Sequence, residues 1–199
     1  EVGTIYSKAE LTALSETCHK YGLYLFLDGA RLGYGLAAPD NDLTLPEIAA
    51  LCDVFYIGGT KVGALFGEAV VIKNPELAQD FRYLIKQNGG MLAKGRLLGL
   101  QFDALFTDGL YQEISAHAIA MAEKLREAFT AKGYNYLAPN RTNQIFVIVP
   151  DAHLAKISEQ FEYSYDQRID ATHSCVRFCT SWATKEENVD ALIRCVEKL

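Results

Sequence analysis

Two apolar runs constrain the fold of this chain more than any other feature, because each ends abruptly in a polar, glycine-containing turn. Leu23 to Leu27 leads into Asp28-Gly29-Ala30-Arg31, and Val54 to Ile57 leads into Gly58-Gly59-Thr60-Lys61. Short continuous apolar runs are typical of strands that are buried on both faces. We therefore predict two central strands that carry polar groups at their carboxyl ends.

Helices are expected before and between these strands. Ser7 and Glu10 have the spacing of a capping box and predict a helix whose apolar face carries Leu11, Leu14, Cys18 and Tyr21, with Gly22 ending it. Thr44 and Glu47 repeat that spacing, with Pro46 in the first turn, and predict a short helix through Leu51.

The order helix, strand, helix, strand predicts parallel strands joined by right-handed crossovers. A third strand, Ala69 to Ile72, follows too soon for a helical crossover and is expected to return antiparallel. The fold class is therefore α/β, with a mixed, mostly parallel sheet in a large domain.

The pattern of the remaining residues predicts a second, smaller domain after the long helices. Asn74-Pro75 begins a helix, residues 91–106 are apolar nearly all round and should be buried or at a subunit interface, and an amphipathic helix covers about 110–131. Beyond it we expect a strand at 144–149, a helix near 152–161, a strand at 174–180 and a helix after Thr184. We assign residues 1–107 to the large domain with its linking helices, and residues 108–199 to a small α/β domain.

Composition and charge exclude several kinds of protein. Apolar residues make up 50% of the 199 and the net charge is −6, so the chain can fill a core and carries no basic footprint for nucleic acid or an anionic membrane. No apolar stretch approaches the ~20 residues that span a bilayer, and no signal peptide pattern is present.

The five cysteines lack metal-ligand spacing and are expected to be reduced, which predicts a cytoplasmic protein. The chain starts without methionine, within an organised pattern, and we expect it to be a C-terminal fragment of a longer protein.

Asp28, Arg31, Thr60 and Lys61 follow two neighbouring strands, so they should meet at one edge of the sheet, where open α/β sheets bind ligands. A structural ion pair between the acid and the lysine is one possibility. Pyridoxal 5′-phosphate is another, because it requires a lysine for a Schiff base and an aspartate beside its protonated pyridine nitrogen. The glycines around Lys61 would also let backbone amides approach a phosphate.

The segments LFLDGARLG (25–33), IGGTKVGALFGE (57–68) and KQNGGM (86–91) resemble the threonine aldolase and β-eliminating lyase family, whose fold is aspartate-aminotransferase-like. The resemblance covers the whole chain and weakens between about residues 133 and 170. It implies that Lys61 is the Schiff-base lysine and Asp28 the partner of the pyridine nitrogen. It further implies that Arg31 contacts the substrate carboxylate, and that Thr60 with Gly59 lies near the cofactor phosphate.

The strand at 174–180 supplies an independent feature. Alternation puts Cys175, Arg177 and Cys179 on one face and apolar residues on the other. Arg177 there needs an anionic partner, either a protein carboxylate or, as the resemblance implies, the α-carboxylate of the substrate. Lys94, near a Gly-Gly turn, lies where the family often supplies a basic residue to a neighbouring subunit's phosphate, although a solvated charged face is an alternative.

The resemblance implies a homo-oligomer, dimer or tetramer, that cleaves the Cα–Cβ bond of a β-hydroxy amino acid such as threonine or allo-threonine, giving glycine and acetaldehyde. β-Elimination or transamination on the same scaffold and a non-catalytic module are the alternatives, and a Rossmann dehydrogenase is disfavoured because no GxGxxG motif follows a strand. The family's phosphate-binding segment and ring-stacking residue lie upstream of Glu1. We therefore expect residues 1–199 alone, without the N-terminal part of the large domain, to bind the cofactor poorly and to be inactive.

Overall fold

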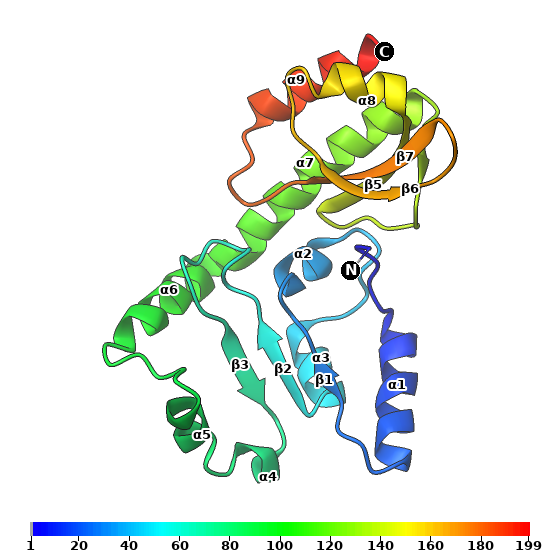
Figure 1. Ribbon diagram of the computed structural model, residues 1–199. Helices are drawn as coiled ribbons and strands as arrows, with labels where there is room; N and C mark the ends of the chain where they lie inside the picture. The colour runs from blue at the N-terminus through cyan, green and yellow to red at the C-terminus, as the bar shows by residue number, and fades with distance from the viewer. Residues whose placement is uncertain (1) are drawn as a thin grey trace. The chain divides into compact units, whose positions relative to one another are not determined.

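The computed structural model describes residues 2–199, which separate into two compact units (Figure 1). The first unit comprises Tyr6–Leu36 and Asn41–Glu113. The second comprises Ile114–Leu199 with two short segments, residues 2–5 and Ala37–Asp40. The contacts thus divide the chain near residue 113, within a long helix. Among the described helices, none combines the length and the hydropathy that a membrane span requires.

The first unit contains a three-stranded mixed sheet with the order β1-β2-β3. Its strands are β1 (Phe26–Leu27), β2 (Val54–Ile57) and β3 (Ala69–Ile72), and its helices are α1 (Lys8–Lys20), α2 (Leu32–Ala37), α3 (Leu45–Leu51), α4 (Pro75–Ala78), α5 (Phe81–Gln87) and α6 (Arg96–Phe106), followed by the 3-10 turn η1 (Thr107–Gly109). β1 and β2 are parallel, and β3 returns antiparallel to β2. The predicted mixed sheet is confirmed.

Both predicted capping boxes form. At the start of α1 the Ser7 hydroxyl accepts from the Glu10 backbone N–H, while the Glu10 carboxylate accepts from the Ser7 backbone N–H at 2.8 Å. Thr44 and Glu47 form the equivalent box at the start of α3. These local contacts need only neighbouring residues, which is why the sequence predicts them well.

Burial around β1 and α1 was predicted wrongly. β1 covers only Phe26–Leu27, and Leu23, Tyr24 and Phe26 are each more than half exposed, because β1 pairs with β2 alone and is the edge of the described sheet. On α1, Leu11 is buried but Leu14 is exposed, as is Tyr21 directly after the helix. Ser15 is buried instead, and its hydroxyl donates to the Leu51 carbonyl oxygen at 2.7 Å, so α1 packs on α3 through a polar contact.

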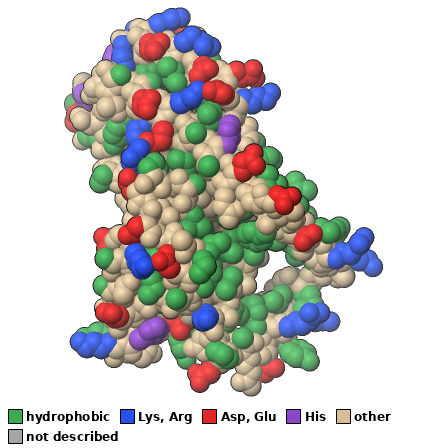
Figure 2. Space-filling model, turned by 180° about the vertical axis from the view of Figure 1, so that it is seen from behind, with side chains coloured by type: hydrophobic (Ala, Val, Ile, Leu, Met, Phe, Trp, Pro, Cys, Tyr) green, Lys and Arg blue, Asp and Glu red, His purple; other side chains and the backbone are tan. Residues whose placement is uncertain are grey.

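The apolar stretch at 91–106 is not buried within its unit. The helix begins at Arg96, only Leu105 of α6 is buried, and Leu97, Leu100 and Phe106 are exposed. Figure 2 shows hydrophobic side chains at the surface, interspersed with charged ones. Packing inside the unit therefore does not account for the apolar character of this segment.

The second unit consists of a four-stranded antiparallel sheet, β4-β5-β7-β6, and three helices. Its elements are α7 (Leu110–Ala131, which starts in the first unit), β4 (Asn135–Tyr136), β5 (Gln144–Pro150), α8 (Asp151–Ile157), β6 (Ser164–Arg168), β7 (His173–Cys179) and α9 (Glu186–Glu197). Side chains of all three helices form one core with side chains of β5 and β7. Figure 1 shows α7, α8 and α9 on the same side of this sheet. The predicted strands and helices lie within a few residues of these bounds. β6 was missed because all five of its residues are exposed and give no apolar alternation.

Candidate functional site

Asp28 follows the end of β1 and is held in place by two donors. The Tyr56 hydroxyl and the Ala30 backbone N–H, the latter at 3.1 Å, both donate to Oδ1 of Asp28. The Tyr56 hydrogen bond is the main cause that lowers the pKa of Asp28. The Ala30 amide and, less strongly, the charges of Lys61 and Arg31 act in the same direction. Asp28 is therefore an anion at neutral pH.

Lys61 follows β2 at the same end of the sheet, after the Gly58-Gly59-Thr60 turn. Its side chain is exposed, and among residues 2–199 it forms no ion pair. Lys61 is nevertheless close enough for its charge to lower the pKa of Asp28. The structure thus brings the predicted acid and amine together without joining them, and the alternative of a direct ion pair does not apply to the described chain.

The two turns that carry these residues are packed backbone to backbone. The Gly58 amide donates to the Gly29 carbonyl oxygen at 2.9 Å. A Cβ on Gly29 would lie 1.7 Å from the Tyr56 carbonyl oxygen, and one on Gly58 would lie 2.3 Å from the Ala30 carbonyl oxygen. Only glycine allows this approach, so these two glycines set the spacing between the segments that carry Asp28 and Lys61.

Two buried tyrosines, Tyr34 and Tyr111, tie the turns to the helices, and no sequence motif predicts this role. The Tyr111 hydroxyl donates to the Gly58 carbonyl oxygen at 2.9 Å and accepts from the Gly33 amide at 3.1 Å. The Tyr34 hydroxyl donates to the carbonyl oxygen of Lys61. Burial raises the pKa of Tyr111, which keeps its hydroxyl protonated. These contacts join residues 27 to 78 positions apart, so no local spacing could reveal them.

Glu68 is a further residue that sequence reasoning missed, although it lies within the 57–68 motif. Its carboxylate accepts from the Gly59 backbone N–H and from the Thr60 hydroxyl, the latter at 2.9 Å. These are the two donors expected near a phosphate. In this structure an acid of the same chain binds both, and a phosphate could use them only after Glu68 released them.

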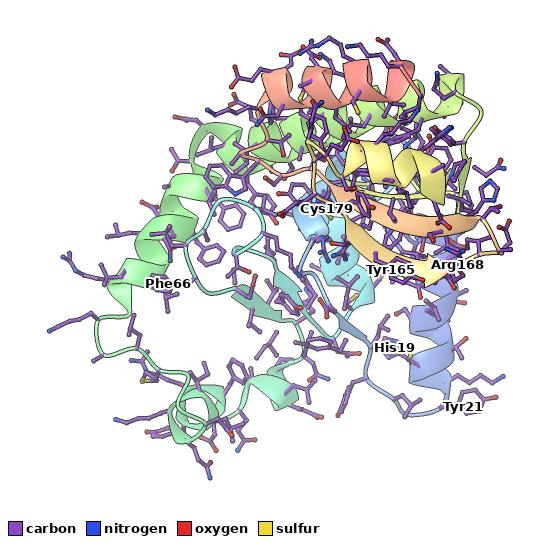
Figure 3. All side chains as sticks on the ribbon, turned by 45° about the horizontal axis from the view of Figure 1, so that its top comes forward. His19, Tyr21, Phe66, Tyr165, Arg168 and Cys179 are labelled. Carbon is purple, nitrogen blue, oxygen red and sulfur yellow. The ribbon has the colours of Figure 1, made fainter. Side chains whose placement is uncertain are left out.

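The other candidates in the first unit lie at its surface. Arg31 is partly exposed in the turn before α2, where its charge acts on Asp28. Lys94 is exposed in the turn before α6, and within residues 2–199 it has no ion pair. Phe66, which Figure 3 labels, lies in the loop between Lys61 and β3 and is also exposed.

Arg177 lies in the second unit, on β7, opposite Phe146 of β5. Its guanidinium lies 6.0 Å from the centre of the Phe146 ring and donates to Gln144 Oε1 at 3.3 Å and to Ser164 Oγ at 3.4 Å. Val176 and Phe178 point to the opposite face and enter the core, as the alternation predicted. Arg177 contacts no carboxylate in the described part of the chain. The protein acid that sequence reasoning allowed as its partner is therefore not found there.

Arg177 also lines a pocket of about 390 Å³ in the second unit. Cys179 and Ser164 contribute to its polar lining, and Phe161, Tyr163 and Phe178 to its apolar lining. Figure 3 labels Cys179 at the end of β7, and Tyr165 and Arg168 on the neighbouring strand β6. A half-buried guanidinium with neutral partners in such a pocket can bind an anion.

The sequence of this chain matches known proteins. The β-eliminating lyase family model matches residues 1–152. The low specificity L-threonine aldolase of Pseudomonas aeruginosa is 32% identical over 195 residues, covering 98% of this chain and 56% of that protein. This chain therefore spans about half the length of that relative.

Solved structures also match this chain. The threonine aldolase of Leishmania major matches with a TM-score of 0.97 and 43% identity, over 100% of this chain and 58% of that one. A putative L-allo-threonine aldolase of Listeria monocytogenes matches with a TM-score of 0.75 and 23% identity, over 98% of this chain and 57% of that one, and shows the shared fold. The expected fold class is confirmed.

Proposed function

Because the chain belongs to the β-eliminating lyase family, we propose that the complete protein is a pyridoxal-phosphate-dependent lyase that cleaves the Cα–Cβ bond of β-hydroxy amino acids. Threonine and allo-threonine, cleaved to glycine and acetaldehyde, are the proposed substrates. The observation that carries the proposal is the placement of Asp28 and Lys61 at one sheet edge, within electrostatic reach but not paired.

The residues present fit the ring end of the cofactor. Asp28 is an anion whose Oδ2 accepts no hydrogen bond from the described residues, so it can face a protonated pyridine nitrogen. Lys61 has an exposed amine that pairs with no carboxylate among the described residues, so it can attach the cofactor covalently. Charged groups at a sheet edge that lack an ion-pair partner are typical of a site where a bound ligand supplies the opposite charge.

When bound, pyridoxal phosphate supplies an electron-poor ring that delocalises the electron pair left on Cα as the Cα–Cβ bond breaks. Asp28 would support this by keeping a negative charge beside the ring nitrogen. Lys61 would hold the cofactor through Nζ, which requires the neutral amine. The hydrogen bonds of Tyr34 and Tyr111 to the backbone around Lys61 would keep that amine in place.

Arg31 and Arg177 are proposed as ligands of the substrate carboxylate. Arg177 supports this best, because its guanidinium has only neutral partners among residues 2–199 and lines a pocket. The planar guanidinium matches a carboxylate with two parallel hydrogen bonds.

At the phosphate end, Gly59 and Thr60 are proposed to lie beside the phosphate, in a turn that Glu68 holds in place by accepting from both of their donors. Lys94 is proposed as a basic residue for the phosphate of a neighbouring subunit. The exposed apolar residues of α6 favour a homo-oligomer, because a large exposed apolar surface is typical of an interface. No disulfide bond joins cysteines among the described residues, and we propose that the complete protein is cytoplasmic.

Product analysis of the complete protein tests this function. With threonine and added cofactor we expect glycine and acetaldehyde in equal amounts, and no product from Lys61→Ala. A matched Lys20→Ala variant, which changes an exposed lysine on α1, should retain activity. Release of ammonia with an oxo acid instead would show β-elimination. If the Lys61→Ala variant kept the visible absorbance of the bound cofactor, the proposed role of Lys61 would be contradicted.

A further inference from the structure

Tyr56 and Asp28 occupy neighbouring positions on adjacent parallel strands. Leu27 of β1 pairs with Phe55 of β2, so Asp28 and Tyr56 follow as the next residues on their two chains. The Tyr56 ring packs against Phe26, with ring centres 6.0 Å apart and planes inclined by 46°. The ring is therefore supported on the sheet, and its hydroxyl reaches the Asp28 carboxylate.

The two oxygens of that carboxylate are used unequally. Oδ1 accepts from both the Tyr56 hydroxyl and the Ala30 backbone N–H, whereas Oδ2 accepts from no donor among the described residues. A carboxylate held through one oxygen by two donors cannot rotate freely, so the direction of the other oxygen is determined.

We propose that Tyr56 is a positioning residue for the cofactor: by holding Oδ1 of Asp28, it leaves Oδ2 directed at the ring nitrogen of pyridoxal phosphate. This inference rests on the proposed function and extends it, because no sequence motif and no comparison assigns a role to Tyr56. The pairing also persists across the pH range in which proteins function. The hydrogen bond lowers the pKa of Asp28, while burial and then that hydrogen bond raise the pKa of Tyr56 to about 12, so the acceptor stays ionised and the donor protonated.

The alternative is that the Tyr56 hydroxyl only joins β1 to β2. The two roles differ in one measurable respect. A positioning residue acts through Asp28, so its effect on cofactor affinity disappears when the carboxylate is removed. A structural residue affects affinity whether or not the carboxylate is present.

The test is a double-mutant cycle on the complete protein, with apoprotein titrated with pyridoxal phosphate. Tyr56→Phe should raise the dissociation constant about 10-fold, the size expected when one hydrogen bond to a charged group is lost. In the Asp28→Ala background the same substitution should change it less than about twofold. The visible circular dichroism of the bound cofactor should also decrease in Tyr56→Phe, since it reports the orientation of the ring.

Tyr24→Phe is the matched control, because Tyr24 precedes β1 and is 55% exposed. It should leave affinity unchanged, and thermal melting of each apoprotein should confirm folding. Equal losses in the two backgrounds, or no loss in Tyr56→Phe, would overturn the inference while leaving the proposed function intact. A wild-type protein that binds no pyridoxal phosphate would overturn both.

Discussion

The Tyr111 hydroxyl donates a hydrogen bond of 2.9 Å to the carbonyl oxygen of Gly58. It also accepts from the Gly33 amide, and the tyrosine is 1% exposed. One side chain therefore satisfies two backbone groups, one in the turn that leads to Lys61 and one in α2. The candidate site depends on this buried support as well as on its motif residues.

Tyr111→Phe should destabilise the protein by about 1–3 kcal/mol, because it leaves a buried amide and a buried carbonyl without their partner. Urea unfolding measures the change in free energy, and Tyr21→Phe, at a tyrosine that is 67% exposed, is the control. Equal free energies of unfolding for the two variants would show that the buried hydrogen bonds do not contribute to stability.

Gly29→Ala should prevent the close approach of the two site turns. Its methyl group would lie 1.7 Å from the Tyr56 carbonyl oxygen, and backbone must move to relieve the clash. We expect a loss of about 3 kcal/mol or more, in line with overpacking. Gly99→Ala on α6 is the control, since a Cβ there meets nothing within 4 Å, and helix propensity should stabilise it by about 0.5–1 kcal/mol. A melting temperature of Gly29→Ala equal to that of the wild type would contradict the geometry.

Glu68→Ala should release the Gly59 amide and the Thr60 hydroxyl and loosen the turn before Lys61. We expect cofactor affinity to fall about 10-fold, which corresponds to the loss of hydrogen bonds to one charged group. Titration of the apoprotein measures it, with Glu16→Ala, an exposed acid on α1, as the control. Tighter binding in Glu68→Ala would show the opposite, that these donors serve the phosphate and that Glu68 competes for them.

The lowered pKa of Asp28 predicts a pH dependence of stability. A carboxylate whose pKa is lower in the folded state contributes stability above its unfolded pKa of about 3.9, and loses it as the pH falls through the folded value. The main cause of the shift is the hydrogen bond from Tyr56. Wild type should therefore lose more unfolding free energy between pH 6 and pH 3 than Asp28→Asn. Identical pH profiles for the two proteins would refute the lowered pKa.

Arg177→Ala should weaken substrate use without weakening cofactor binding, because Arg177 is proposed to hold only the substrate carboxylate. Loss of a charge-assisted hydrogen bond of about 1.5–3 kcal/mol predicts a decrease in kcat/KM of about 10- to 100-fold. Steady-state kinetics with threonine and a cofactor titration together measure this. Arg194→Ala, an exposed arginine on α9, is the control. A matching decrease in cofactor affinity would contradict the assignment.

The sequence by itself determined the elements whose causes are local. The capping boxes at Ser7 and Thr44, the mixed sheet and the long helix α7 follow from spacing, periodicity and turn residues close together in the chain. It also indicated which residues are candidates for the chemistry, because a charged group at the end of an apolar strand is costly unless a partner or a ligand compensates its charge.

Only the tertiary structure decided how those residues are held. The partners of the site, Tyr56 with Asp28, Glu68 with Thr60 and Tyr111 with Gly58, are brought together by strand pairing and helix packing. Burial was decided there too: β1 is exposed because it forms the edge of the described sheet, although its composition is that of an interior strand. Hydrogen bonds between distant segments and the neighbours of a strand depend on how the whole chain folds, so no local pattern encodes them.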